Sequence, residues 1–306
     1  MKLVFMGYGE LGATMLRGLA PHHQVALVLT HDSDFTGLGE PDVEVAAAEL
    51  GLPVVRSPRA AEPEVHAQVR AAAPEVIVST NWRTTVPPEV LHIPRLGALN
   101  VHDALLPRYA GFGAVNWAIR NGEDKTGLTV HFMDEKLDTG PVVVRSFVTI
   151  DPDDTAGQVL ARLTARYVPA CLEALERVEQ GDRGETQDPV DGSFYHRIRL
   201  PDTRIDWRDG TPRLHDLVRG QSDPFVNAWT THEGLRLFVK AATPPERAYC
   251  GTPGRIIARA EGGVAVACGR TPEPDARGLI LLQVQTEGGP PVRAVDYFVR
   301  CGGYLD

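Results

Sequence analysis

The residues best suited to chemistry are an asparagine, a histidine and an aspartate within the stretch Leu99–Gly140. Asn100 and His102 stand two residues apart. Alternate residues of an extended segment face the same way, so the amide and the imidazole can project together from the end of a strand. Asp138 follows on a D-T-G turn. An amide, an imidazole and a carboxylate that meet at one point can stabilise an oxyanion and move a proton, so we predict that these three residues are catalytic.

A second candidate is the glycine-rich turn Gly7-x-Gly9-x-x-Gly12, which directly follows the apolar run Lys2–Met6. Asp32 stands about twenty residues further on, as in dinucleotide-binding folds, so one interpretation is an NAD(P)-dependent oxidoreductase. The other interpretation is structural, because a tight strand-to-helix turn needs glycine whatever binds there. We favour the structural interpretation and keep the oxidoreductase as an alternative of another class.

The elements that must position these residues alternate between apolar strands and amphipathic helices. Short apolar runs, expected to be strands buried on both faces, are separated by helical patterns, which is typical of a mainly parallel sheet covered by helices. Two closely spaced strands at 127–133 and 141–150 are expected to form an antiparallel edge, and a long helix is expected over 155–180. After residue 207, brief strands separated by Gly and Pro predict a small β-barrel, with strands at 235–241, 254–258, 263–267 and 279–285.

Composition limits the partners. The 306 residues include 31 Lys and Arg against 40 Asp and Glu, a net charge of −9, which argues against a nucleic-acid partner held mainly by phosphate contacts. The four cysteines show neither a C-x-x-C pair nor a metal-like spacing, so we expect free thiols, a reducing compartment and no metal. With no signal peptide and no apolar run long enough for a membrane span, we predict a cytoplasmic protein with no membrane partner.

The run N-V-H…L-L-P-R-Y-x-G…N-W-A-I…T-G-L-T-V-H-F-M-D…L-D-T-G resembles the signature of the folate-dependent formyltransferases, such as the methionyl-tRNA and nucleotide-amino-sugar enzymes. The resemblance implies that 10-formyltetrahydrofolate is the co-substrate and that Asn100, His102 and Asp138 are the catalytic residues. It implies an α/β fold: a Rossmann-like, mainly parallel N-terminal formyltransferase domain over 1–185, a linker over 186–206 and a small OB-like barrel over 207–306. In this family the N-terminal domain uses no dinucleotide.

The resemblance also implies where the two substrates bind. Reduced folate is expected along the loop after the strand at 76–79 and against the turn that carries Asp138. The cofactor-binding residues are then Thr80, Asn81, Trp82, Arg83, Thr84, Leu105, Asp134, Leu137 and Gly140. For the acceptor, the substrate-binding residues are Tyr8, Gly9, His31, Asp32, Arg108, Tyr109, Arg197 and Arg199.

The acceptor is an amine whose identity is less constrained. The chain reads Tyr109-Ala110-Gly111 where the family usually has Y-R-G, and Asp103 with Ala104 where small residues usually follow the histidine. The short loop after residue 30 and the segment 194–207 resemble those of the sugar enzymes. We therefore predict a small-molecule amine, an amino sugar that is nucleotide-linked or a natural-product intermediate, with methionyl-tRNA as the alternative. A homodimer is compatible with the sequence.

Overall fold

The computed structural model describes residues 1–31, 43–57 and 59–306. Contacts between Cα atoms divide the chain into two compact units. The first comprises Met1–Gly111, Gly127–Val148 and Arg162–Phe194, and the second comprises Phe112–Thr126, Thr149–Ala161 and Tyr195–Asp306. The chain therefore passes between the units several times. The division into a catalytic domain, a linker and a C-terminal domain at 185 and 207 stays a prediction.

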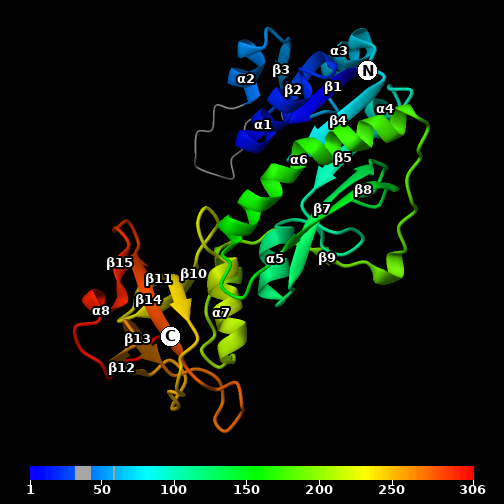
Figure 1. Cartoon of the computed structure of the whole chain (residues 1–306). Helices are drawn as coiled ribbons and strands as arrows, with labels where there is room; N and C mark the ends of the chain where they lie inside the picture. The colour runs from blue at the N-terminus through cyan, green and yellow to red at the C-terminus, as the bar shows by residue number, and fades with distance from the viewer. Residues whose placement is uncertain (32–42, 58) are drawn as a thin grey trace. The chain divides into compact units, whose positions relative to one another are not determined.

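A seven-stranded sheet with the order β3-β2-β1-β4-β5-β7-β8 forms the centre of the first unit (Figure 1). The strands are β1 (Lys2–Gly7), β2 (Gln24–Thr30), β3 (Val54–Arg56), β4 (Val76–Thr80), β5 (Ala98–His102), β7 (Lys125–Phe132) and β8 (Val142–Thr149). Neighbours among the first five strands run parallel, and β7 runs antiparallel to β5. This arrangement confirms the predicted Rossmann-like, mainly parallel sheet.

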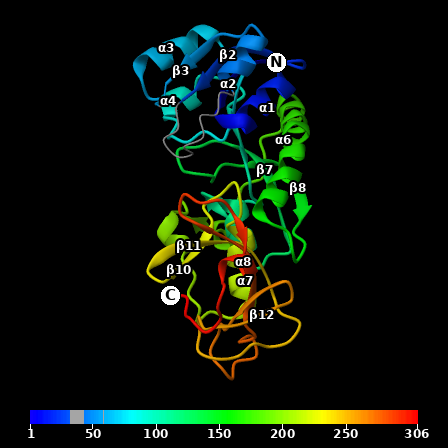
Figure 2. The ribbon, with the colours of Figure 1, turned by 90° about the vertical axis from the view of Figure 1, so that its left-hand side faces the viewer.

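Helices cover both faces of this sheet (Figures 1 and 2). They are α1 (Gly9–Leu19), α2 (Val43–Glu49), α3 (Pro63–Ala72), α4 (Pro88–Leu91) and α6 (Ala156–Glu179). One core cluster joins Val4, Met6 and Ile77 of the strands to residues of α3 and α4. On the other face α1 and α6 touch, since a Cβ at Gly18 would lie 2.4 Å from the Val168 side chain. Because both faces are covered, β1 and β4 are almost wholly buried and mainly apolar.

The glycine-rich turn between β1 and α1 has a packing reason for its composition. Gly9 has a φ of +70°, which a residue with a side chain rarely adopts. A Cβ at Gly12 would lie 2.8 Å from Val43, and one at Gly7 would lie 2.4 Å from the Phe5 ring. Glycine is therefore required here by the backbone and its neighbours, as the structural interpretation of the motif expects.

The second unit contains an antiparallel sheet with the order β10-β11-β14-β13-β12, and β15 pairs with β14. These strands are β10 (Ala228–His232), β11 (Leu235–Thr243), β12 (Ile256–Ala260), β13 (Gly263–Val266), β14 (Leu279–Thr286) and β15 (Val292–Arg293). At the C-terminus, Tyr304 bridges to Arg255 and Leu305 bridges to His232, so the last residues join the two edges of the sheet. This closure gives the small barrel that the sequence predicts.

Three helices complete the second unit: α5 (Ala114–Arg120), α7 (Thr211–Gly220) and α8 (Ala294–Tyr297). The Asn116 amide donates to the main-chain oxygen of Gly220 at 2.7 Å, which fastens α5 to α7. Arg219 of α7 donates to the main-chain oxygens of Asp151 and Asp154 at 3.3 and 3.2 Å. Two further short strands are β6 (Ala110–Gly111) and β9 (Phe194–Tyr195), and single 3₁₀ turns span Pro189–Asp191 and Leu200–Thr203.

Cys171, Cys250, Cys268 and Cys301 are all free, as the sequence predicts. Across the described part of the chain, no helix combines the length and the apolar character needed to cross a membrane.

Candidate active site

Strand β5 carries two of the three predicted catalytic residues, Asn100 and His102. It lies between β4 and β7, with Asn100 paired to Ser79 on one side and to His131 on the other. His102 is the last residue of the strand, at the carboxyl edge of the parallel part of the sheet. In open α/β sheets, ligands bind at that edge. The i, i+2 spacing therefore brings the Asn100 amide and the His102 imidazole to the same side of the strand, as predicted.

Asp138 is held by the turn between β7 and β8. Its φ is +57°, in the left-handed region that aspartate tolerates better than most residues. Its Oδ2 accepts a hydrogen bond from the Gly111 N–H at 2.9 Å. The Gln187 amide donates to the main-chain oxygens of Asp138 at 2.9 Å and of Gly140 at 2.7 Å. The turn is thus fixed from two sides, and its carboxylate has one defined direction.

The imidazole of His102 lies between two oxygen atoms. Its Nδ1 is 3.7 Å from Asp138 Oδ2, and its Nε2 is 3.0 Å from the main-chain oxygen of Tyr109. A carbonyl oxygen only accepts, so Nε2 carries a proton. When Nδ1 is also protonated, the resulting cation faces the carboxylate of Asp138. The predicted pair of His102 and Asp138 is therefore present, with the imidazole able to donate from either nitrogen.

His131 on β7 joins the predicted residues into one network. Its Nε2 is 3.3 Å from the Asn100 Nδ2 and 3.6 Å from Asp138 Oδ1. Its Nδ1 is 2.8 Å from the main-chain oxygen of Phe132, so Nδ1–H donates there and Nε2 is free to accept from the Asn100 amide. This contact orients Asn100 and leaves its second N–H available. His131 has no role among the sequence predictions above, although it stands in the T-V-H-F-M-D part of the family signature.

The pKa of Asp138 reflects this environment. Burial raises the pKa of the carboxyl group, but the positive charge of His102 and the hydrogen bond from the Gly111 N–H are among the influences that outweigh burial and lower the pKa to about 2. The site therefore stabilises the ionised carboxylate at neutral pH. The site therefore places a fixed negative charge beside the His102 imidazole, which can donate to an oxyanion.

Predicted residues from both substrate sites meet in an aromatic cluster, which we define as Tyr8, His31 and Trp82. The rings of Tyr8 and His31 are stacked, with centroids 4.9 Å apart, and Trp82 meets His31 edge-on at 4.7 Å. Asn81 donates to the main-chain oxygen of Tyr8 at 3.1 Å. Arg83 donates through its main-chain N–H to His31 at 3.4 Å, and its guanidinium lies 5.8 Å from the Tyr8 ring. The loop after β4 is therefore attached to the ends of β1 and β2.

The other predicted folate residues occupy different environments. Thr80 is fully buried at the end of β4, whereas Thr84 is exposed. Leu105 is half-buried, and Leu137 is half exposed, at 51%. Asp134 accepts from the Thr139 hydroxyl at 2.7 Å within the turn that carries Asp138. A Cβ at Gly140 would lie 1.9 Å from the Phe132 oxygen, so only glycine fits there.

The remaining predicted acceptor residues are divided between the units. Tyr109 is buried, and the Arg108 guanidinium lies 5.4 Å from its ring. Arg197 and Arg199 belong to the second unit, where Arg197 lies 4.9 Å from the Phe112 ring and Arg199 begins a 3₁₀ turn. Asp32 lies outside the described residues. The binding roles of all these residues stay predictions.

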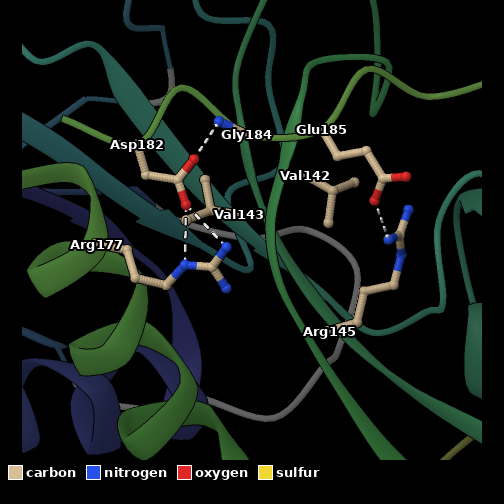
Figure 3. Close-up of a pocket in the computed structure, with 7 residues that line it drawn as sticks. All are labelled: Val142, Val143, Arg145, Arg177, Asp182, Gly184 and Glu185. Atoms are coloured by element: carbon tan, nitrogen blue, oxygen red, sulfur yellow. Dashed lines mark hydrogen bonds and ion pairs between the residues drawn. The ribbon is translucent and has the colours of Figure 1, made fainter.

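A separate hollow in the first unit contains none of the predicted site residues (Figure 3). Two ion pairs line it, Arg177 with Asp182 at 2.8 Å and Arg145 with Glu185 at 3.0 Å. Each guanidinium in this hollow is already paired with a carboxylate.

Comparisons with known proteins match nearly the whole chain. The formyl transferase family matches residues 1–175, and the formyl transferase C-terminal domain matches residues 197–301. The chain is 34% identical to the methionyl-tRNA formyltransferase of Geobacter metallireducens, covering 98% of this chain and 96% of the relative. It is 33% identical to that of Desulfotalea psychrophila, covering 94% and 89%. The fold matches that of WlaRD, a sugar 3N-formyl transferase solved with dTDP and 5-N-formyl-THF, with a TM-score of 0.67, 15% identity and coverage of 94% and 97%.

Proposed function

Because the chain belongs to the formyl transferase family, we propose that it transfers a formyl group from 10-formyltetrahydrofolate to the amino group of methionyl-tRNA. The family assignment confirms the predicted enzyme class, a folate-dependent formyltransferase, and its formyl donor. The acceptor is the part that we propose. The observation that carries it is the 34% identity to a methionyl-tRNA formyltransferase over 98% of this chain. The relatives therefore support the alternative acceptor of our sequence analysis better than the amino sugar that we preferred.

The proposed reaction begins when the neutral amine attacks the formyl carbon and forms a tetrahedral oxyanion. Asn100 donates its free N–H to this oxygen, since its other N–H is directed at His131. The His102 imidazole donates a second hydrogen bond. One well-placed donor of this kind stabilises a transition state by about 2.7–4 kcal/mol. In this structure the Nε2–H of His102 donates to the main-chain oxygen of Tyr109. The developing oxyanion would compete with that oxygen for the same proton.

Asp138 completes the proposed machinery through its charge. Its ionised carboxylate lies 3.7 Å from His102 Nδ1 and can relay the amine proton through water. Acid–base assistance of this kind contributes roughly 10²–10⁴ in rate. The proton reaches N10 of the leaving tetrahydrofolate when the intermediate collapses.

A small amine, such as a nucleotide-linked amino sugar, is the second candidate acceptor because of the charge of the chain. From Trp207 to the end, 12 Lys and Arg stand against 11 Asp and Glu, and the first 206 residues carry 19 against 29. Tight tRNA binding normally depends on a basic surface that neutralises phosphates. Neither part of this chain has an excess of positive charge that would provide one.

One experiment separates the two acceptors. The purified protein is given 10-formyltetrahydrofolate with either charged initiator methionyl-tRNA or a panel of nucleotide-linked amino sugars. Tetrahydrofolate release and the mass gain of one formyl group on the acceptor are then followed. We expect turnover with methionyl-tRNA and a gel shift with that tRNA at physiological salt. Turnover with an amino sugar and none with tRNA would establish the second candidate, and Asp138→Asn controls for uncatalysed transfer.

A further inference from the structure

One segment of the first unit, residues 185–193, takes no part in the proposed chemistry but contacts backbone on both sides of the catalytic residues. We call this segment the strap. At its start, Glu185 exchanges two main-chain hydrogen bonds with β8, each of 2.8 Å. Gln187 then holds the turn that carries Asp138, as described above. At its end, Ser193 reaches the loop between β5 and β6. The strap therefore connects the two backbone segments that contact the catalytic side chains.

Ser193 forms three hydrogen bonds with the loop. Its Oγ accepts from the Tyr109 N–H at 2.9 Å, and its main-chain oxygen accepts from the Ala110 N–H, also at 2.9 Å. Its own N–H donates to the main-chain oxygen of Pro107 at 3.2 Å. The first two of these bonds hold the peptide groups on either side of the Tyr109 Cα. One residue of the strap thus sets the orientation of both groups.

Tyr109 needs such support because of its backbone conformation. Its φ is +61°, in the left-handed region, which a residue other than glycine keeps only where its surroundings hold it there. In this conformation its main-chain oxygen lies 3.0 Å from His102 Nε2. Without the Ser193 hydroxyl, the Tyr109 N–H would lose its acceptor, and the residue could relax toward an ordinary negative φ. The oxygen that orients the imidazole would then move.

The same short stretch of backbone contacts both members of the catalytic pair. The Tyr109 oxygen accepts from His102, and two residues later the Gly111 N–H donates to Asp138 Oδ2 at 2.9 Å. A change in the Tyr109 peptide groups would therefore shift the acceptor of the imidazole and the donor to the carboxylate together. Displacements of about 1 Å that begin away from the chemistry can cost up to about 100-fold in rate.

We propose that Ser193 is a positioning residue, which directs the His102 imidazole by holding Tyr109 in its left-handed conformation. This inference rests on the proposed formyl transfer, in which His102 donates to the oxyanion. The hydroxyl of Ser193 contacts neither substrate in this role and acts only through the Tyr109 oxygen. Its loss should therefore lower kcat and leave donor binding unchanged.

The kinetic test uses Ser193→Ala, which removes the hydroxyl and keeps the main-chain hydrogen bonds of the strap. We expect kcat to fall about tenfold, the equivalent of about 1.4 kcal/mol and of one hydrogen bond. The KM for 10-formyltetrahydrofolate should stay within about twofold of wild type. Where the alanine variant does not fold, Ser193→Cys replaces it, with a loss of about threefold, because sulfur is a weaker acceptor than oxygen.

Two further variants separate positioning from a general effect on the strap. Ser193→Thr keeps a hydroxyl acceptor at the same place, so its kcat should return to within about twofold of wild type. Thr186→Ala is the matched control, since it removes an exposed hydroxyl from the same segment and should match wild type.

The second measurement examines His102 directly and needs no turnover. Protein labelled with ¹⁵N in its ten histidine rings is studied by long-range ¹H–¹⁵N correlation spectra, which show the nitrogen that carries the proton. The signals of His102 are identified by their absence in His102→Gln. We expect protonated Nε2 and a single set of His102 signals in wild type and Ser193→Thr. In Ser193→Ala these signals should be displaced or broadened.

The other outcomes contradict the proposal. A kcat for Ser193→Ala within about twofold of wild type would show that the hydroxyl does not matter for the reaction. A loss of kcat with unchanged His102 signals, or a loss that threonine does not restore, would assign Ser193 a different role. A wild type that formylates no acceptor would overturn the proposed function instead, and the spectra would still decide whether Ser193 directs His102.

Discussion

Replacing Asp138 by asparagine tests the proposed mechanism most directly. Asparagine keeps the shape of the side chain and can still accept the Gly111 N–H, so the substitution removes the charge and leaves the turn. The carboxyl pKa falls from its usual 3.8 to about 2 in the folded protein. At 1.36 kcal/mol per pKa unit, the fold prefers the ionised group over its neutral form by about 2 kcal/mol. If the transition state loses an interaction of this size with His102, kcat falls by about 30-fold.

The same difference in the pKa of Asp138 between the unfolded and folded states determines how the substitution changes the free energy of unfolding. A lowered pKa in the folded state stabilises the fold above the unfolded-state pKa of about 4, and this contribution is lost as the pH falls toward 2. Asp138→Asn should therefore lower the free energy of unfolding by about 2 kcal/mol at pH 7 and by far less near pH 2. Urea unfolding of wild type and variant at both pH values measures this difference.

The activity assay is initial-rate release of tetrahydrofolate at saturating acceptor, with kcat and the KM for 10-formyltetrahydrofolate determined separately. We expect kcat to fall by at least about 30-fold and KM to change by less than about threefold. Glu135→Gln, which removes an exposed charge nearby, should match wild type. A variant that keeps a kcat within about fivefold of wild type while folding normally would refute the role assigned to Asp138.

Three further variants test residues that position Asn100 and the turn carrying Asp138. His131→Gln should lower kcat about tenfold with little change in the KM for the donor, because Asn100 loses its orienting acceptor; the split between kcat and KM measures this. Gln187→Ala removes two hydrogen bonds to the turn and should cost about 1–3 kcal/mol in urea unfolding together with a lower kcat; full stability would contradict it. Gly140→Ala forces a Cβ onto the Phe132 oxygen, so we expect at least about 100-fold less activity and a lower melting temperature by calorimetry.

Much of the first unit is predictable because the hydrophobic pattern of each segment favours the same helix or strand that the packed fold requires. The long helix expected over 155–180 is α6 at Ala156–Glu179, and the strand that carries Asn100 is β5. Apolar runs buried on both faces leave few alternatives to a parallel sheet. The i, i+2 spacing of Asn100 and His102 needs only an extended backbone, so their meeting could be foreseen.

The parts that could not be foreseen depend on distant partners. In the sequence, His131 looks like any other residue of a strand. It lies opposite Asn100 only because β7 pairs with β5, and the sequence does not show that pairing. Gln187 lies in a polar segment without periodicity. Its hydrogen bond to the turn at Asp138 joins residues far apart in the sequence, so only the folded structure shows it. Strand β10, Ala228–His232, is short and largely polar, so its assignment rests on its pairing with β11.

The interleaved path of the chain has a practical consequence for exchanging acceptor preference between relatives. Helix α5 buries Ala114, Val115 and Ile119 and is fastened to α7, although ninety residues of sequence separate them. A fragment cut before α7 would leave that surface bare and prone to aggregate. A chimeric enzyme should therefore take segments 112–126 and 149–161 from the same parent as residues 195–306, because these three segments pack together in one unit.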